Sequence, residues 1–175
     1  MAFAQNNIDR IRFDDPVTLL TKQNAKLLER GWAGYFSREI FTAINEQRFA
    51  VLFSEEKRGR YNASVNYIVS MLILKEMFRL TDSAVVQAVT FDLRFKYALN
   101  CSSIPNSPAS APSLARFRKK VAAYKRKTGI DLLEEEYNAL GEPIRIMLSR
   151  YRIKPAAGSR IAVFKKATVK KVKQK

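Results

Sequence analysis

The 175-residue chain contains no histidine and a single cysteine, Cys101. Without histidine there is no Ser-His or Cys-His catalytic pair and no histidine metal ligand. A single cysteine allows neither an internal disulfide nor a cysteine-cluster zinc site. Glycine is scarce as well, with six residues, and no Gly-rich phosphate loop is present. Several common kinds of catalytic and metal site are thereby excluded, and we expect no cofactor.

Long apolar runs are missing too. The most apolar segment, residues 69–74, is much too short to span a bilayer. The first residues lack a basic stretch followed by an apolar run, which is the pattern of a secretory signal peptide. We therefore expect a cytoplasmic protein with no membrane partner. Hydrophobic residues still form 47% of the chain, enough for a folded core.

Charge is strongly one-sided. The chain has 32 Lys and Arg against 16 Asp and Glu, a net charge of +16. Two stretches carry cations and no acid: residues 93–130, with nine basic residues, and residues 150–175, with ten. An excess of this kind favours a polyanionic partner, most often nucleic acid.

The hydrophobic spacing predicts an all-α fold. Residues 65–79 are apolar on nearly every side, which is typical of a helix at the centre of a domain. With a tight turn and a short helix over 83–90, they form a helix-turn-helix-like unit. Further helices are expected over 37–50, 93–99, 131–140 and 144–151. We expect an irregular or helical segment (1–34), a compact helical domain (35–150) and a disordered, basic, low-complexity tail (151–175).

The most informative stretch is residues 113–127, which read as a helix with an apolar stripe and a basic back. We expect Ser113 to cap this helix and Gly129 to end it. Its apolar stripe consists of Leu114, Phe117, Val121 and Tyr124. One side of such a helix can pack on its own domain while the other meets phosphates.

The cations of this helix, with two from residues 93–99, are our candidate DNA contacts. They are Arg94, Lys96, Arg116, Arg118, Lys119, Lys120, Lys125, Arg126 and Lys127. Most would contact phosphates, and Arg116 or Arg118 could reach base edges. An ordinary solvated helix is the competing interpretation. Such helices usually mix charge signs and gain from Glu-Lys pairs four residues apart, and none occurs here.

Four segments in order resemble a known family. They are NYIVSMLILKEMFRLTD (66–82), FDLRFKYAL (91–99), SLARFR (113–118) and TGIDLLEEEY (128–137). Together they resemble the N-terminal region of DDE-class insertion-sequence transposases, of the InsH type, over about residues 35–150. The resemblance implies a helical domain that binds the element's terminal DNA. In that family a separate RNase H-like domain follows, and its acids bind the divalent metal for strand transfer.

The chain departs from the family pattern in two places. An acid usually lies shortly before the Arg-Phe-Arg sequence, where this chain has Ala111 and Pro112. No acid follows Glu142, so the catalytic domain has no counterpart. We therefore expect a transposase truncated by a frameshift near 152–160, without strand-transfer activity, that binds DNA, full-length transposase or a second copy. The alternatives are a helical dimerisation module, a metal-dependent enzyme, or a decayed gene product.

Overall fold

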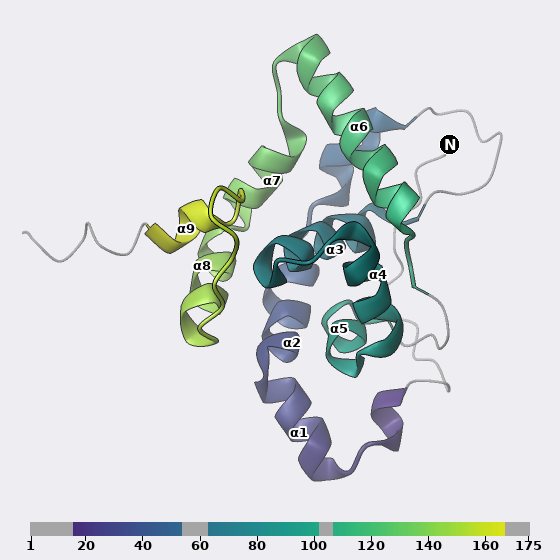
Figure 1. Cartoon of the computed structure of the whole chain (residues 1–175), viewed down its shortest axis with the longest axis vertical. Coiled ribbons are helices and arrows are strands. Elements are labelled where there is room, and N and C mark those ends of the chain that lie inside the picture. The colour runs from purple at the N-terminus through teal and green to yellow at the C-terminus, as the bar shows by residue number, and fades with distance from the viewer. Residues whose placement is uncertain (1–15, 54–62, 102–106, 167–175) are drawn as a thin grey trace, which may run out of the picture.

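Every regular element of the described residues is helical, and the computed structural model describes residues 16–53, 63–101 and 107–166. The all-α prediction is confirmed, and the arrangement is shown in Figure 1. The elements are η1 (Pro16–Leu19), α1 (Lys22–Arg30), α2 (Trp32–Tyr35), η2 (Phe36–Phe41), η3 (Glu46–Leu52), α3 (Val65–Phe78), α4 (Asp82–Phe91), α5 (Leu93–Ala98), α6 (Ala111–Thr128), α7 (Leu132–Ala139), α8 (Gly141–Arg150) and α9 (Ala162–Lys166).

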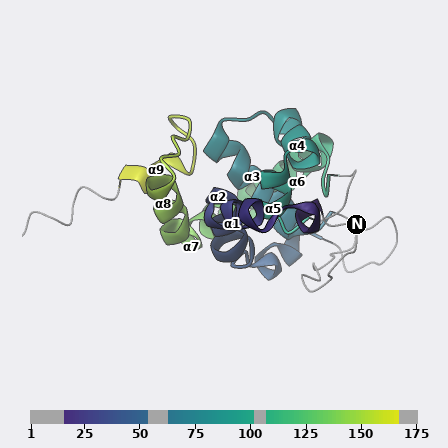
Figure 2. The ribbon, with the colours of Figure 1, turned by 90° about the horizontal axis from the view of Figure 1, so that it is seen from below.

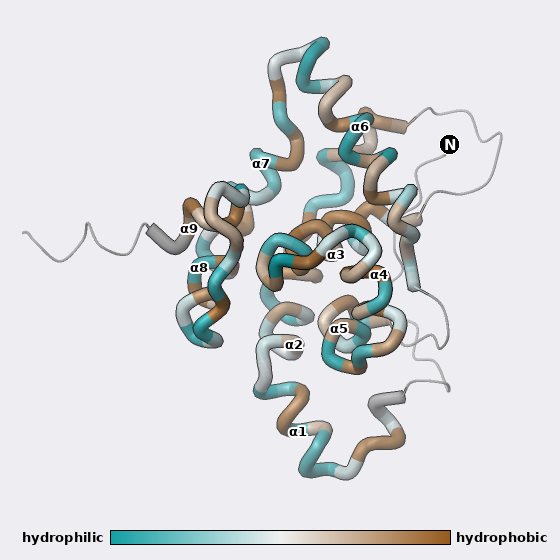
Figure 3. Tube along the Cα trace, in the orientation of Figure 1, coloured by the Kyte–Doolittle hydropathy of each residue, from teal (hydrophilic) through white to brown (hydrophobic). Residues whose placement is uncertain are grey.

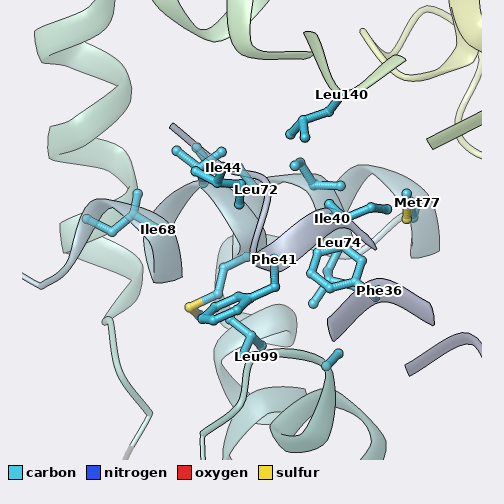
Figure 4. Close-up of a cluster of buried hydrophobic side chains, with 14 of the residues drawn as sticks. Phe36, Ile40, Phe41, Ile44, Ile68, Leu72, Leu74, Met77, Leu99 and Leu140 are labelled. Atoms are coloured by element: carbon cyan, nitrogen blue, oxygen red, sulfur yellow. The ribbon is translucent and has the colours of Figure 1, made fainter. Parts of the chain in front are cut away.

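Helix α3 lies at the centre of the molecule, as its composition predicts. Ten of its 14 residues are buried, and the hydropathy trace is most continuously apolar along it (Figure 3). Figure 4 shows the core around it, where Leu72 and Leu74 lie among side chains such as Ile40 from η2 and Leu140 from the junction of α7 and α8. Because α3 is apolar on most sides, it is stable only when other helices enclose it.

The start of α3 depends on an acid from outside the helix. Ser64 occupies the N-cap position, but its side chain makes no capping hydrogen bond there. Instead, Ser64 Oγ donates to Glu46 Oε1 at 2.6 Å, and the same oxygen accepts the Asn66 N–H at 2.8 Å. Glu46 is buried and belongs to η3. This carboxylate therefore satisfies an orphan N–H at the end of the central helix.

The helix-turn-helix-like unit forms where expected. Arg79 ends α3 in the left-handed conformation, with φ of 56°, and Thr81 caps α4 by accepting the Ala84 N–H at 3.1 Å. The left-handed residue turns the chain sharply, so only three residues, 79–81, separate α3 from α4. This geometry describes two packed helices and does not by itself indicate DNA reading.

The expected helix over residues 37–50 does not form as one piece. It is replaced by the π-helix η2, a break at 42–45 and the 3₁₀-helix η3. Gly34 lies inside α2 rather than ending a helix. A Cβ at Gly34 would lie 1.8 Å from the carbonyl oxygen of Glu29. Gly34 therefore allows a close approach of two backbone segments, a role that its isolated position in the sequence does not reveal.

Packed structure continues past residue 150, where the sequence predicts that a basic tail begins. Ile153, Pro155 and Ile161 are buried, and Arg79 donates to the carbonyl oxygens of Lys154 and Pro155 at 2.8 and 3.2 Å. Residues 151–164, the C-terminal strap, follow α8 and include the start of α9, at one edge of the molecule (Figure 2). Residues 167–175 of the expected disordered tail lie outside the described part.

Within the described ranges, no helix combines the length and apolar composition that crossing a membrane requires.

The Gly34 contact yields a stability prediction. Gly34→Ala should lower the free energy of unfolding by about 3 kcal/mol, since the added methyl group meets rigid backbone. Gly158→Ala is the matched control, because Gly158 has a positive φ of 82° and no atom within 4 Å of a new Cβ. Its cost should be about 1 kcal/mol. Urea unfolding of both variants measures the difference, and equal losses would contradict the close approach at Gly34.

Candidate nucleic-acid interface

Helix α6 carries most of the predicted contacts, and it begins two residues earlier than expected. Ser110 is the N-cap, and its Oγ accepts the Ser113 N–H at 3.4 Å. Pro112 lies in the first turn, where its missing N–H costs nothing. Gly129, with φ of 79°, ends the helix as expected. The predicted cap at Ser113 is therefore wrong by one turn, while the predicted end is confirmed.

The two halves of α6 have different surroundings. Leu114, Phe117 and Val121 are buried, and Phe117 packs on Phe49 with ring centroids 5.4 Å apart. From residue 122 to residue 130 no residue is buried. Figure 1 shows this second half leading away from α3 to the upper end of the molecule. The predicted apolar stripe is confirmed for the first half, and the second half projects from the domain.

Four of the predicted cations face outward along α6: Arg116, Lys119, Arg126 and Lys127. Each is exposed, and none of them forms an ion pair with an acid of the described part. Among the described residues, Arg116 alone of these four makes a side-chain hydrogen bond, from its Nε to the Pro112 carbonyl oxygen at 3.3 Å. These residues, the outward cations, form a strip of uncompensated positive charge.

Arg118 has a different role from its neighbours. Its Nη1 and Nη2 donate to the two oxygens of Asp82, at 3.0 and 2.5 Å. Lys75 Nζ also donates to Asp82 Oδ1, at 2.6 Å. The hydrogen bonds from Arg118, outweighing burial, lower the pKa of Asp82. The carboxylate therefore ties α6 to α3 and to the first turn of α4.

Lys125 is likewise held by an acid. Asp131 Oδ2 accepts Lys125 Nζ at 3.1 Å, and Oδ1 accepts Arg160 Nη1 at 3.0 Å. Oδ1 also caps α7 by accepting the Glu134 N–H at 3.1 Å. Burial alone would raise the pKa of Asp131, but these hydrogen bonds together lower it to about 2. One buried carboxylate thus joins α6, α7 and the C-terminal strap.

None of the three remaining predicted contacts, Lys120, Arg94 and Lys96, is a free cation at the surface. Lys120 Nζ donates to the Leu52 carbonyl oxygen at 3.2 Å and lies 4.4 Å from the centre of the Phe53 ring; burial lowers its pKa. Arg94 is exposed but pairs with Asp92 at 2.7 Å. Lys96 is 5% exposed. Lys96 is therefore too buried to contact DNA at the surface.

The sequence predicts only some of the residues that organise this site. Asp131 is recognisable as a cap, but its ion pairs with Lys125 and Arg160 are not. Asp82 lies 36 positions from Arg118, so no local spacing indicates the pair. Arg160 lies in the segment whose composition predicts a low-complexity tail. In the described residues no group of three or more His, Cys, Asp or Glu is placed to hold a metal ion.

The described part is thus an all-helical domain with a protruding basic helix, an arrangement suited to binding a polyanion. Residues 26–120, just over half of the chain, match the family model described as a transposase domain (DUF772). The chain belongs to this family, which indicates a role related to transposition. Comparisons with curated proteins and with solved structures found no match.

The lowered pKa of Asp131 predicts a pH-dependent contribution to stability. The carboxylate stabilises the fold fully above its unfolded pKa of 3.8, and the effect is lost as pH falls through about 2. Asp131→Asn keeps a capping side chain but removes the charge. At pH 7 the variant should lose about 2 kcal/mol of unfolding free energy.

The measurement is urea unfolding of the wild type and the variant at pH 7 and at pH 2.5. The difference between them should shrink at the lower pH, because protonation removes the same charge from the wild type. Glu134→Gln, at an exposed acid 4.0 Å from Lys125, is the control and should change stability little. A loss for Asp131→Asn that is equal at both pH values would contradict the charge effect.

Proposed function

We propose that this chain is the DNA-binding domain of an insertion-sequence transposase of the DDE class and the InsH type, without strand-transfer activity of its own. The observation that carries this proposal is the acid-free outward face of α6. The family membership supports a transposition-related role, and the resemblance of the four sequence segments supports the finer assignment. The ligand would be DNA at the ends of the element.

The second half of α6 has the form of a helix that enters a groove. It extends past the packed first half of α6, and its outward side is open to a duplex (Figure 1). The B-DNA major groove, about 12 Å wide, admits one α-helix. Ala123 is exposed between the cations, and its short side chain would let the helix backbone approach the bases. Arg126 and Lys127 would then contact phosphates on the flanking strands.

The two arginines considered for base contacts are now distinguishable. Arg118 has both Nη atoms on Asp82, so its fork is already used in holding α6. Arg116 is exposed and uses only Nε, in a 3.3 Å hydrogen bond within its own helix. Its Nη atoms suit the bidentate pairing with guanine O6 and N7. Arg116 is therefore our candidate for base reading, and Arg118 for positioning.

A chain that binds element ends without cutting them would compete with full-length transposase. The dimer alternative placed α3 and its neighbours at a subunit interface. Within the described part, α3 itself leaves no large apolar side chain exposed, so such an interface would have to form on its neighbours, where Phe91 of α4 and Val51 of η3 are exposed. Mg²⁺-dependent strand cleavage by the purified chain would overturn the non-catalytic part of the proposal.

The DNA-binding proposal is tested by the salt dependence of affinity. Each phosphate contact contributes about 0.9 to the slope of log K against log salt concentration. Replacing Lys119, Arg126 and Lys127 with Ala should therefore lower the slope by roughly 2 to 3. Fluorescence anisotropy of a labelled duplex, over a range of NaCl concentrations, measures it.

The matched control removes the same charge from the far end of the molecule. Lys22, Lys26 and Arg30 lie on α1, at the opposite end from the tip of α6 (Figure 1), and all three are exposed. Their replacement with Ala should leave the slope nearly unchanged. Equal reductions in the two triple variants would show that net charge alone drives binding, and would sink the assignment to α6.

The division between Arg116 and Arg118 gives a separate expectation. Arg118→Ala should lower the free energy of unfolding by about 2 kcal/mol, since Asp82 loses a bidentate partner. Arg116→Ala should leave stability within about 0.5 kcal/mol of the wild type and still weaken DNA binding. Thermal unfolding and anisotropy on the same samples compare the two. The reverse pattern, with Arg116→Ala unstable and Arg118→Ala impaired only in binding, would contradict the assignment.

A further inference from the structure

We propose that a cavity beside α6 binds a small organic carboxylate with an apolar body, independently of DNA. The cavity lies between α3, α6, α7 and Arg160 of the C-terminal strap, and its volume is about 300 Å³. It opens on the flank of α6 and is lined by Lys125 and Arg118 rather than by the outward cations. A ligand there would leave the proposed DNA-binding face uncovered.

The cavity has an apolar wall that suits the body of such a ligand. Leu72, Val121 and Leu133 form this wall, one residue from each of the three helices. A cavity of roughly 150 Å³ is enough to hold benzene in a protein core. The volume here leaves room for a six-membered ring together with a carboxylate. Apolar walls with a few converging polar groups are the usual composition of small-molecule sites.

The charges around the cavity favour a single negative charge. Three cations line it, Arg118, Lys125 and Arg160, against two acids, Glu76 and Asp131. The lining therefore has one positive charge in excess, and the neighbouring Asp82, which holds Arg118, is itself balanced by Lys75. A monoanion such as a carboxylate compensates that excess, whereas a phosphate monoester, with a charge near −2, would exceed it.

Arg160 is the cation best placed to hold the carboxylate. It donates to Asp131 through Nη1 alone, at 3.0 Å, although a guanidinium has five N–H donors in a fixed fork. Its side chain is 44% exposed, so a ligand can reach it. If Arg160 turned part of its fork to a ligand, Asp131 would keep Lys125 Nζ and the Glu134 N–H. The exchange would leave no buried carboxylate without a partner.

Glu76 defines where the ligand's negative charge would not lie. Its Oε2 accepts the Ile161 N–H at 3.3 Å, and burial raises its pKa. Glu76 comes from α3, whereas Lys125 and Asp131 lie near the junction of α6 and α7. We therefore place the ligand carboxylate beside Lys125 and the guanidinium of Arg160, both of which also contact Asp131, and the apolar body against Val121 and Leu133.

The experiment uses benzoate as the probe and the ¹⁵N-labelled full chain. Amide shifts should saturate with benzoate and concentrate on residues that line the cavity, such as Ala122 and Tyr137. Benzyl alcohol, a neutral molecule of similar size, should bind at least tenfold more weakly. Equal binding of the two probes, or benzoate shifts centred on Arg116 and Lys119, would overturn the proposal.

Two variants separate the site from general anion binding. Arg160→Gln should weaken benzoate binding at least tenfold, whereas Arg126→Gln, which removes one charge outside the cavity, should not. Ala122→Leu narrows the cavity without a change in charge, keeps a good helix former, and should also weaken benzoate binding. Unchanged affinity in both Arg160→Gln and Ala122→Leu would refute the site. DNA binding by Ala122→Leu, measured separately, reports on the proposed function.

Discussion

The burial of α3 is the constraint on which the rest of the structure depends. Most of its side chains are apolar, so no face of it can be left to water, and η2, η3, α4 and α6 all pack against it. Enclosure also buries polar groups at its start, which must find partners inside the protein. Glu46 accepts the Asn66 N–H, and Asn66 Nδ2 donates to the Phe41 carbonyl oxygen at 3.1 Å. The central helix is therefore stabilised by apolar packing along its length and by buried hydrogen bonds at one end.

The second organising feature is that two acids form ion pairs with some of the cations of α6 and leave the others unpaired within the described part. Asp82 takes Arg118, and Asp131 takes Lys125, so both acids neutralise the cations on the flank that faces the protein. The outward cations keep their charge because no acid of the described part lies against them. A helix that the sequence shows as uniformly basic is thereby divided into a structural flank and a strip of uncompensated charge.

Local patterns predicted much of the fold. The apolar run that forms α3 and Gly129 at the end of α6 both depend on residues within one or two turns of each other. The differences arise where contacts outside a single helix decide the outcome. Gly34 is explained only by the approach of the Glu29 backbone across the bend between α1 and α2, and the strap only by contacts with residues at the ends of α3 and α7. For the site, exposure separated Lys119 from Lys96, although both are lysines in basic helices; only the tertiary packing distinguishes them.

The division of α6 into a packed half and a projecting half has a consequence for how its sequence can change. Residues such as Leu114 and Phe117 fill fixed volumes, so substitutions there are limited by the core. Beyond residue 121 the limit is weaker, since none of its residues is buried, although Tyr124 still packs on the core and Lys125 still pairs with Asp131. Its composition can drift while the fold stays the same, subject only to helix propensity and to whatever it touches. One uninterrupted helix thus joins a half whose sequence is restricted by the core to a half whose sequence can change to suit a new target.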